Sequence, residues 1–275
     1  MKRKEFKDGI YDITNEEYHA SAGVSRSTLM LLNKSPYHFW YEVFSGRAER
    51  KEDTPAMIIG SLFHTLLLEP HKLDKEYAIA PKIDRRTAKG KEEWAEFQTY
   101  SEGKIVVTLD QYEKSQEMAN QIREHEIVST LLGEAVFEQS IFWTDKETGL
   151  QFKVRPDIWA EKMVVDVKTS ADASYYAFQR SSVGYGYFLQ AGMIFEACKA
   201  VGKPFEMFVN LVCEKEPPYV PAVYMMDEEA LQFGIDQFNN LKKNLRECLD
   251  KDEWPAYPVR ELGVPMYALK NIDEE

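Results

Sequence analysis

Hydrophobic positions recur at helical spacing through the first half of the chain. Ser25 is a suitable N-cap for a helix over 26–32. Ser35 followed by Pro36 predicts a second helix, which should stop at Gly46. Further helices are predicted over 56–68, 91–100 and 111–132, the last capped by Asp110 and ended by Gly133, with a short strand over 105–109. This part of the chain is therefore predicted to be mainly helical.

From residue 135 the pattern changes to the shorter period of β-strands. Strands are predicted over 135–143, 150–159, 163–169, 205–214 and 219–225, and helices over 185–200 and 227–250. Such an order predicts an α/β fold with a mixed central sheet flanked by helices and an N-terminal helical lobe. No linker-like stretch interrupts it. We therefore expect one domain over 1–275, with a mainly helical lobe over 1–132 and a core over 133–275.

The most informative pattern is a predicted hairpin that carries charges at matching positions. With a turn at 161–162, antiparallel pairing places Asp157 opposite Asp166 and Arg155 opposite Lys168. Opposed residues in such a ladder have Cβ atoms about 4.5–5.5 Å apart, where like charges repel. Because alternate side chains share a face, Asp166 and Lys168 should lie together. Two facing carboxylates need a cation between them, and a hard divalent ion such as Mg²⁺ suits oxygen ligands.

A blander interpretation exists, because exposed hairpins often alternate Asp and Lys and a D-x-K motif alone is a weak signal. The Pro156–Asp157 pair at hairpin distance strengthens the metal-site interpretation.

Four other side chains could complete such a site. His64 follows Gly60 by one helical turn, and the glycine leaves room for another element, although a hydrogen-bonded core histidine is the commoner case. Glu138 falls on a predicted strand, either facing the site or exposed. Tyr187 and Gln190 are three residues apart on one helix face. Gln190 could bond a phosphate, a base or a metal-bound water, or it could be a polar residue at the solvent rim.

Composition narrows the class of protein. A hydrophobic content of 44% with 13% aromatic residues is typical of a folded globular chain. No run approaches the roughly 18 apolar residues of a membrane span, and the segment 1–5 has no apolar stretch behind it, so we expect neither a membrane segment nor a secretory signal. The 3 cysteines are far apart, which argues against disulfides, zinc and an iron–sulfur cluster and favours a reducing, cytoplasmic location.

The net charge of −12 is unfavourable for nucleic-acid binding on average, but local patches can differ from the mean. The segment 82–91 is rich in basic residues and includes Arg85, Arg86 and Lys89. It is either a solvated charged loop or a DNA contact.

Together these stretches resemble the PD-(D/E)XK nuclease superfamily and, within it, the RecE-like phage and prophage exonucleases of the RecB-type branch. The matching stretches are 24–36, 60–70, 153–157, 165–169, 185–191 and 254–257. They follow the order of that family over most of the chain. One position departs from the pattern: the family often has Tyr four residues after the helix Gln, and Ile194 stands there in this chain.

The resemblance implies a role for each candidate residue. Asp157, Asp166 and Lys168 would be catalytic, with Lys168 orienting the attacking water. His64, Asp157, Asp166 and the Val167 carbonyl would bind Mg²⁺ or Mn²⁺, and Glu138 would serve a second, weaker ion. The implied contacts with DNA are Gln190, Tyr187, Arg155, Arg85, Arg86 and Lys89.

The resemblance further implies a processive 5′→3′ exonuclease on the ends of linear double-stranded DNA. Such an enzyme would form a homo-oligomeric ring and supply single strand to a single-strand annealing protein, away from any membrane. Three alternatives stay open: a catalytically silent DNA-binding or scaffold relative, an endonuclease or single-strand nuclease of the same fold, and a metal-dependent hydrolase of smaller substrates. The intact set of Asp157, Asp166 and Lys168 counts against the first.

Overall fold

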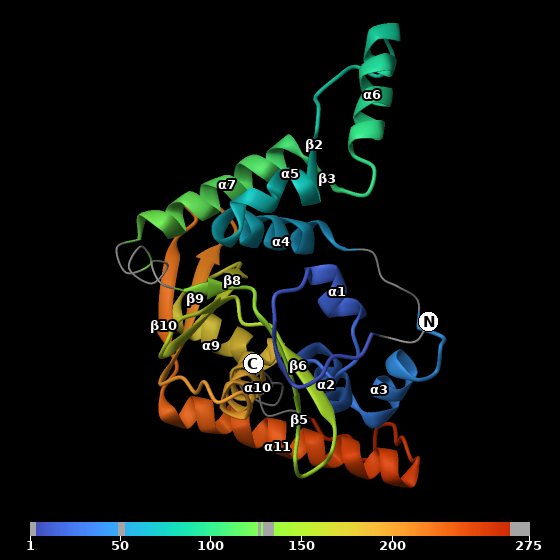
Figure 1. Ribbon diagram of the computed structural model, residues 1–275, viewed down its shortest axis with the longest axis vertical. Helices are drawn as coiled ribbons and strands as arrows, with labels where there is room; N and C mark the ends of the chain where they lie inside the picture. The colour runs from blue at the N-terminus through green and yellow to red at the C-terminus, as the bar shows by residue number, and fades with distance from the viewer. Residues whose placement is uncertain (1–3, 49–52, 126–127, 129–134, 265–275) are drawn as a thin grey trace, which may run out of the picture.

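The computed structural model describes residues 4–48, 53–125, 128 and 135–264 (Figure 1). Its centre is a five-stranded mixed sheet with the strand order β10-β9-β8-β7-β4. β8 and β9 run parallel, and the other neighbours are antiparallel. The strands are β4 (Val136–Phe137), β7 (Ile158–Trp159), β8 (Met163–Ser170), β9 (Met207–Glu214) and β10 (Pro221–Met225). This sheet confirms the predicted mixed α/β class.

Two smaller sheets accompany it. An antiparallel sheet joins β1 (Gly9–Tyr11), β5 (Ser140–Thr144) and β6 (Gln151–Val154). A parallel pair joins β2 (Tyr77–Ala80) to β3 (Ile105–Thr108). β1 and β2, with three and four residues, were not among the predicted strands.

Helices cover both faces of the central sheet (Figure 1). The described helices of eight or more residues are α2 (Arg26–Lys34), α3 (Pro36–Val43), α4 (Pro55–Leu68), α6 (Ala88–Tyr100), α7 (Leu109–Glu124), α9 (Tyr175–Tyr185), α10 (Tyr187–Ala200) and α11 (Glu228–Lys251). Shorter ones are α1 (Asn15–Ala20), α5 (Leu73–Glu76) and the 3-10 turn Pro70–Lys72. None of the helices in the described ranges is long and apolar enough to cross a bilayer.

The two faces of β8 contribute to different parts of the core. Val165 and Val167 pack with residues of α4 and α7, whereas Val164 packs with residues of α10 and α11. Because side chains alternate along a strand, Asp166 and Lys168 project on the same side as Val164, toward α10. The prediction that these two charges share one face is therefore confirmed.

Capping residues set the helix starts largely as predicted. The Ser25 and Ser35 side chains accept hydrogen bonds from backbone amides of α2 and α3, and Pro36 occupies the first turn of α3. At α7 the cap is Thr108, in a capping box with Gln111, so the assignment to Asp110 was wrong. This helix ends at Glu124, and the predicted stop at residue 133 lies outside the described residues.

Two predicted strands are each broken into two that belong to different sheets. The stretch 135–143 contains β4 and β5, and the stretch 150–159 contains β6 and β7. The first break is at Glu138, whose φ is +52°, and the second spans 155–157. The hairpin register holds beyond the breaks, because Ile158 pairs with Val165. Arg155 lies outside the ladder, so its predicted position opposite Lys168 was wrong.

The helix α9 was not predicted. Its sequence, from Tyr175 to Tyr185, mixes aromatic, serine and glycine residues without a clear apolar period. Only Phe178 and Ser182 are buried, one turn apart, and the other positions face outward or lie at intermediate depth. A helix that buries so narrow a stripe gives a weak sequence signal.

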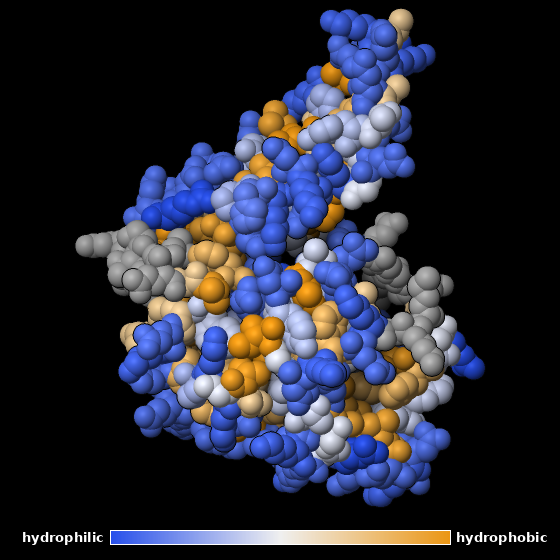
Figure 2. Space-filling view, viewed as in Figure 1, coloured by the Kyte–Doolittle hydropathy of each residue, from blue (hydrophilic) through white to orange (hydrophobic). Residues whose placement is uncertain are grey.

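The helix α6 and the strands β2 and β3 project away from the central sheet at the top of Figure 1. Most of the surface of this projection is hydrophilic in the view of Figure 2. The basic segment 82–91 covers the connection from β2 to α6 and the first turn of α6.

Close packing of α10 against α11 generates the first prediction. A Cβ on Gly234 would lie 1.9 Å from the Phe188 carbonyl oxygen, and one on Gly192 would lie 2.3 Å from the Gly234 carbonyl carbon. Gly234→Ala should therefore lower the free energy of unfolding by about 1–3 kcal/mol or more in urea denaturation, since the helices must separate. Gly184→Ala is the matched control, because its Cβ meets nothing within 4 Å. A Gly234→Ala protein as stable as Gly184→Ala would contradict this packing.

Candidate active site

The two strand breaks meet at one point and bring two carboxylates together. The amide of Glu138 donates to the carbonyl of Asp157 at 3.0 Å. The left-handed backbone at Glu138 costs on the order of 1–3 kcal/mol for a residue with a Cβ. This turn of the chain lets both side chains leave the sheet toward α4, which carries His64.

His64, Glu138 and Asp157 form a compact cluster of metal-type donors. One donor atom from each lies within 4.8 Å of the others. His64 Nδ1 is 3.9 Å from both Glu138 Oε1 and Asp157 Oδ2, while its Nε2 is 3.0 Å from the Val167 carbonyl oxygen. A proton on Nε2 donates to that carbonyl and leaves the lone pair of Nδ1 facing the carboxylates. The Val167 carbonyl, which the resemblance assigns to the metal, here accepts a hydrogen bond from His64, so its role as a metal ligand stays a prediction.

The Asp157 and Glu138 carboxylates are each oriented by a short hydrogen bond. The Val167 amide donates to Asp157 Oδ2 at 2.6 Å, and Arg155 Nε donates to Glu138 Oε2 at 2.6 Å. The Arg155 guanidinium also donates to the Ile13 carbonyl and to the Ser140 hydroxyl. Its side chain is only 8% exposed. Because these partners use the guanidinium inside the protein, we reassign Arg155 from DNA contact to positioning of Glu138.

Asp166 is bound by residues of β8 and α10. Its Oδ1 accepts from Gln190 Nε2 at 2.7 Å, and its Oδ2 contacts the Lys168 ammonium. Lys168 Nζ lies 4.9 Å from the centre of the Tyr187 ring. The predicted helix face of Tyr187 and Gln190 therefore lies against the Asp166–Lys168 pair. The structure separates the predicted ligand set, since Glu138, not Asp166, stands in the tight cluster with His64 and Asp157.

The charges in this site shift the pKa values of its groups. Burial, reinforced by the negative charges of Asp166 and Glu138, raises the pKa of Asp157 to about 7 despite the opposing effect of His64 and Lys168. Burial lowers the pKa of His64, but the Asp157 and Glu138 carboxylates outweigh it and the net shift is upward. For Glu138, burial raises the pKa, and His64 and Arg155 more than reverse that effect. Of the Glu138 and Asp157 carboxylates, Asp157 is therefore the one whose negative charge the surrounding protein compensates less.

Asn210 is a residue at the site that sequence reasoning missed. It is the register partner of Asp166 on the parallel neighbour β9, so their side chains share a face. Asn210 is buried, and within the described part of the chain its Oδ1 and the Oε1 of Gln190 have no hydrogen-bond partner. A lone Asn in the apolar strand 207–213 was a usable signal, because buried amides normally have partners.

The predicted basic DNA contacts lie apart from this cluster. Arg85 stacks over the Trp94 ring at 4.4 Å, Arg86 pairs with Asp84, and Lys89 pairs with Glu93. No interaction found among the described residues joins these three side chains to the site. Their contact with DNA stays a prediction, and it would have to come from substrate that extends to α6.

The donor set fits a divalent cation. An imidazole nitrogen and two carboxylates within 4.8 Å are ligands that Mg²⁺ and Mn²⁺ accept. An ion there would stabilise the charged form of Asp157, which burial and the neighbouring carboxylates disfavour. His64 Nδ1, Glu138 Oε1 and Asp157 Oδ2 would hold it. Asp166 and Lys168 lie on the neighbouring stretch of β8.

A mixed sheet flanked by helices, with Pro156–Asp157 and Asp166-x-Lys168 on one hairpin, defines the PD-(D/E)XK class of folds. The chain belongs to the family described as "PDDEXK-like domain of unknown function (DUF3799)", whose model matches residues 25–259. No protein with a curated description matches the sequence significantly.

One solved structure agrees with this chain at the level of the fold. The crystal structure of "Putative exonuclease" from Eubacterium rectale superposes with a TM-score of 0.60 at 15% identity, covering 94% of this chain and 98% of that one. The crystal structure of SSO0001 gives a TM-score of 0.29 at 13% identity, covering 66% of this chain and 86% of that one, which is too partial to define a fold.

The raised pKa of Asp157 predicts a pH-dependent loss of stability in metal-free protein. Its pKa is about 7 in the folded state against an ordinary 3.8, so its contribution is present below pH 3.8 and is lost as pH rises through 7. Asp157→Asn removes this loss. We expect the variant to exceed the wild type in Tm by several degrees at pH 8 in EDTA, and the difference to shrink toward pH 4, measured by circular dichroism.

Added Mn²⁺ should reverse the order, because it stabilises only the protein whose Asp157 is a carboxylate. Equal pH dependence of Tm in the two metal-free proteins would contradict a buried, poorly compensated Asp157.

Arg155→Ala should affect both stability and metal binding. The change removes the closest cationic partner of the buried Glu138 carboxylate and should cost about 3–5 kcal/mol in unfolding free energy. It should also weaken Mn²⁺ at least about tenfold in calorimetric titration, because Glu138 is no longer held. The control Arg246→Ala removes an exposed pair with Asp250 and should change neither value appreciably. Normal Mn²⁺ affinity with weakened DNA binding would instead return Arg155 to the substrate contacts.

Proposed function

We propose that the protein is a divalent-metal-dependent deoxyribonuclease. The observation that carries this proposal is the convergence of His64, Glu138 and Asp157 beside the Asp166–Lys168 pair, in a buried site whose charges are not balanced by the protein alone. Perturbed carboxylates gathered with a lysine are characteristic of functional sites. Membership of the PDDEXK-like family and the fold shared with an "exonuclease" structure support the same class of reaction.

The chain's own residues have distinct parts in phosphodiester hydrolysis. His64, Glu138 and Asp157 would hold the divalent ion, whose charge would lower the pKa of a bound water and stabilise the negative charge that develops on phosphate. Lys168 orients the nucleophilic water and opposes negative charge, while Asp166 fixes the Lys168 ammonium. Gln190 in turn fixes Asp166 through one carboxylate oxygen, so the catalytic lysine is held by a chain of side-chain contacts that starts on α10.

We further propose exonuclease action on the ends of linear double-stranded DNA, in the 5′→3′ direction. The support is the sequence resemblance to RecE-like exonucleases together with the fold shared with the "Putative exonuclease" of Eubacterium rectale. The same resemblance supports a homo-oligomeric ring, Mg²⁺ or Mn²⁺ as the ion, and a single-strand annealing protein as the recipient of the product strand.

One gel tests the reaction and its substrate. Purified protein is incubated with linear, nicked and covalently closed circular duplex, with Mg²⁺ or with EDTA. The proposal predicts degradation of linear DNA that EDTA abolishes, with the closed circle intact. Nicking or linearisation of the closed circle would indicate an endonuclease, and absence of hydrolysis with both Mg²⁺ and Mn²⁺ would indicate a silent relative. Strands labelled at the 5′ or the 3′ end give the direction, and release of 3′ label first contradicts 5′→3′ action.

Substitutions in the Asp166–Lys168 pair should remove activity without unfolding the protein. Lys168→Ala and Asp166→Ala are each expected to lower the initial rate of linear-duplex degradation by at least about a hundredfold, because charge stabilisation at the reacting phosphate is lost. Lys162→Ala serves as control: this lysine lies in the turn of the same hairpin, is exposed and pairs with Glu206. A folded Asp166→Ala protein with near-normal turnover would refute the assigned site.

A further inference from the structure

A continuous cluster of aromatic rings runs from the catalytic lysine to the surface. Lys168 lies over the Tyr187 ring, and Tyr187 contacts both Tyr185 and Phe178, at ring-centre distances of 5.8 Å. The cluster continues from Phe178 through Tyr224 and Tyr175 to Tyr176. It belongs to α9, the first turn of α10 and β10, and it is continuous with the active site.

The outer members of this cluster are exposed far beyond what folding requires. Tyr176 is 76% exposed, Tyr185 is 63% and Tyr175 is 56%. The inner residue Phe178 is buried, and its ring stacks on that of Tyr224 with the ring centres 5.2 Å apart. This packing fixes the part of the cluster against which the outer rings lie. Large aromatic side chains that gather in the open beside an active site are typical of a binding surface.

The charge of this region differs from that of the rest of the chain. The chain has 46 acidic residues in 275, yet none lies between residues 173 and 195. Arg180 is exposed on α9, and Arg26 donates to the Tyr185 carbonyl from the neighbouring α2. In a protein of net charge −12, this segment is therefore suited to a polyanion.

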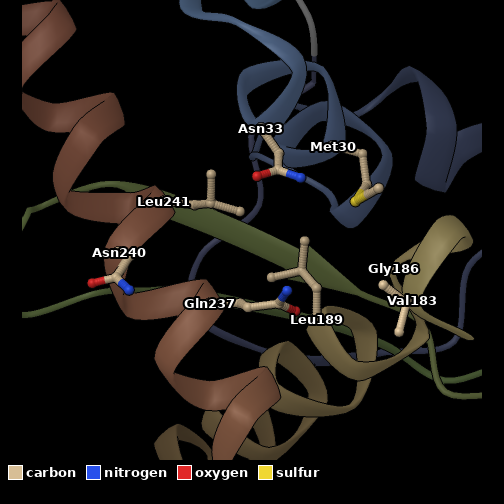
Figure 3. A pocket seen from close by; sticks show the side chains of 8 residues that line it. All are labelled: Met30, Asn33, Val183, Gly186, Leu189, Gln237, Asn240 and Leu241. Carbon is tan, nitrogen blue, oxygen red and sulfur yellow. The ribbon is translucent and has the colours of Figure 1, made fainter. Parts of the chain in front are cut away.

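Two hollows adjoin the exposed rings. An open groove of about 420 Å³ is lined by Tyr176, Gln179, Arg180, Val183 and Phe188. A second cavity of about 180 Å³ shares Val183 and lies between α2, α10 and α11 (Figure 3). Its lining includes the amides of Asn33, Gln237 and Asn240, which can hydrogen-bond base edges or phosphate oxygens.

We propose that α9 and the start of α10 form a track for a single DNA strand. Bases stack on Tyr185, Tyr175 and Tyr176, and the phosphates lie toward Arg180. Stacking on aromatic side chains requires bases that are not enclosed in a duplex, so the occupant is an unpaired strand next to the cleavage site. This inference rests on the proposed nuclease function and adds to it the surface that holds the strand. The face is not assigned to a second protein copy, because its segment 173–195 carries Arg180 and no acidic residue, which favours a polyanion.

The test measures binding separately from hydrolysis. A fluorescein-labelled dT12 oligonucleotide is titrated with full-length protein in EDTA, and its anisotropy is followed. Tyr185→Ala and Tyr176→Ala are each expected to raise the Kd by about tenfold, while Tyr185→Phe, which keeps the ring, recovers most of the affinity. Arg180→Ala should weaken binding and flatten its salt dependence. Tyr100→Ala, which removes an exposed tyrosine from α6, is the control and should leave the Kd within twofold.

The outcomes distinguish a failure of the proposed DNA track from a failure of the proposed nuclease activity. Wild-type affinity in both tyrosine-to-alanine variants overturns the track even where the wild type degrades DNA with Mg²⁺. A change in oligomeric state by light scattering, with the Kd for dT12 unchanged, also overturns it and makes this face a protein interface. If the wild type hydrolyses no DNA with Mg²⁺ or Mn²⁺, the proposed function fails, and the anisotropy of the variants still decides whether the track binds a strand.

Discussion

Repulsion between buried carboxylates is the constraint on which the rest of this structure depends. Burial, reinforced by the negative charges of Asp166 and Glu138, raises the pKa of Asp157 to about 7, although the nearby His64 and Lys168 oppose this shift. Each of the other two carboxylates has a cationic partner of its own: Arg155 for Glu138 and Lys168 for Asp166. The negative charge of Asp157 therefore remains only partly compensated. A bound dication would compensate it, and this links the fold to metal-dependent chemistry.

The backbone departs from regular strand geometry where it serves this constraint. Glu138 adopts a left-handed backbone, and the chain leaves the ladder between β6 and β7 around Pro156. At both departures the chain passes between the five-stranded and the three-stranded sheet, and both leave an acidic side chain at the crossing. Arg155 connects the crossing to Ile13 and Ser140, so the N-terminal region helps to hold an active-site carboxylate. At this site the strained backbone of Glu138 coincides with the residues that form the candidate active site, as is common at functional sites.

The sequence predicted the parts of this arrangement that depend on period and spacing. The hairpin register, the shared face of Asp166 and Lys168, the caps at Ser25 and Ser35, and the helix that carries Gln190 follow from alternation, chain distance and capping chemistry. The two strand breaks could not be predicted in this way, because a positive φ at a glutamate leaves no recognisable pattern in a single sequence. Arg155 was misplaced for a similar reason, because its partners Ile13, Glu138 and Ser140 come together only through tertiary folding. Asn210 is an unusual polar residue in an apolar strand, but its place beside Asp166 becomes evident only from the pairing of β8 with β9. The helix α9 lacks the apolar stripe that marks a buried helix.

Anomalous diffraction from crystals grown with Mn²⁺ tests the central claim most directly. The account predicts a manganese peak bounded by His64 Nδ1, Glu138 Oε1 and Asp157 Oδ2, with the ligand distances of a first coordination shell. It also predicts that the peak disappears in Asp157→Asn crystals of the same form. A wild-type map without manganese at these three atoms, or a peak that persists unchanged in Asp157→Asn, would contradict the claim that a bound dication neutralises this cluster.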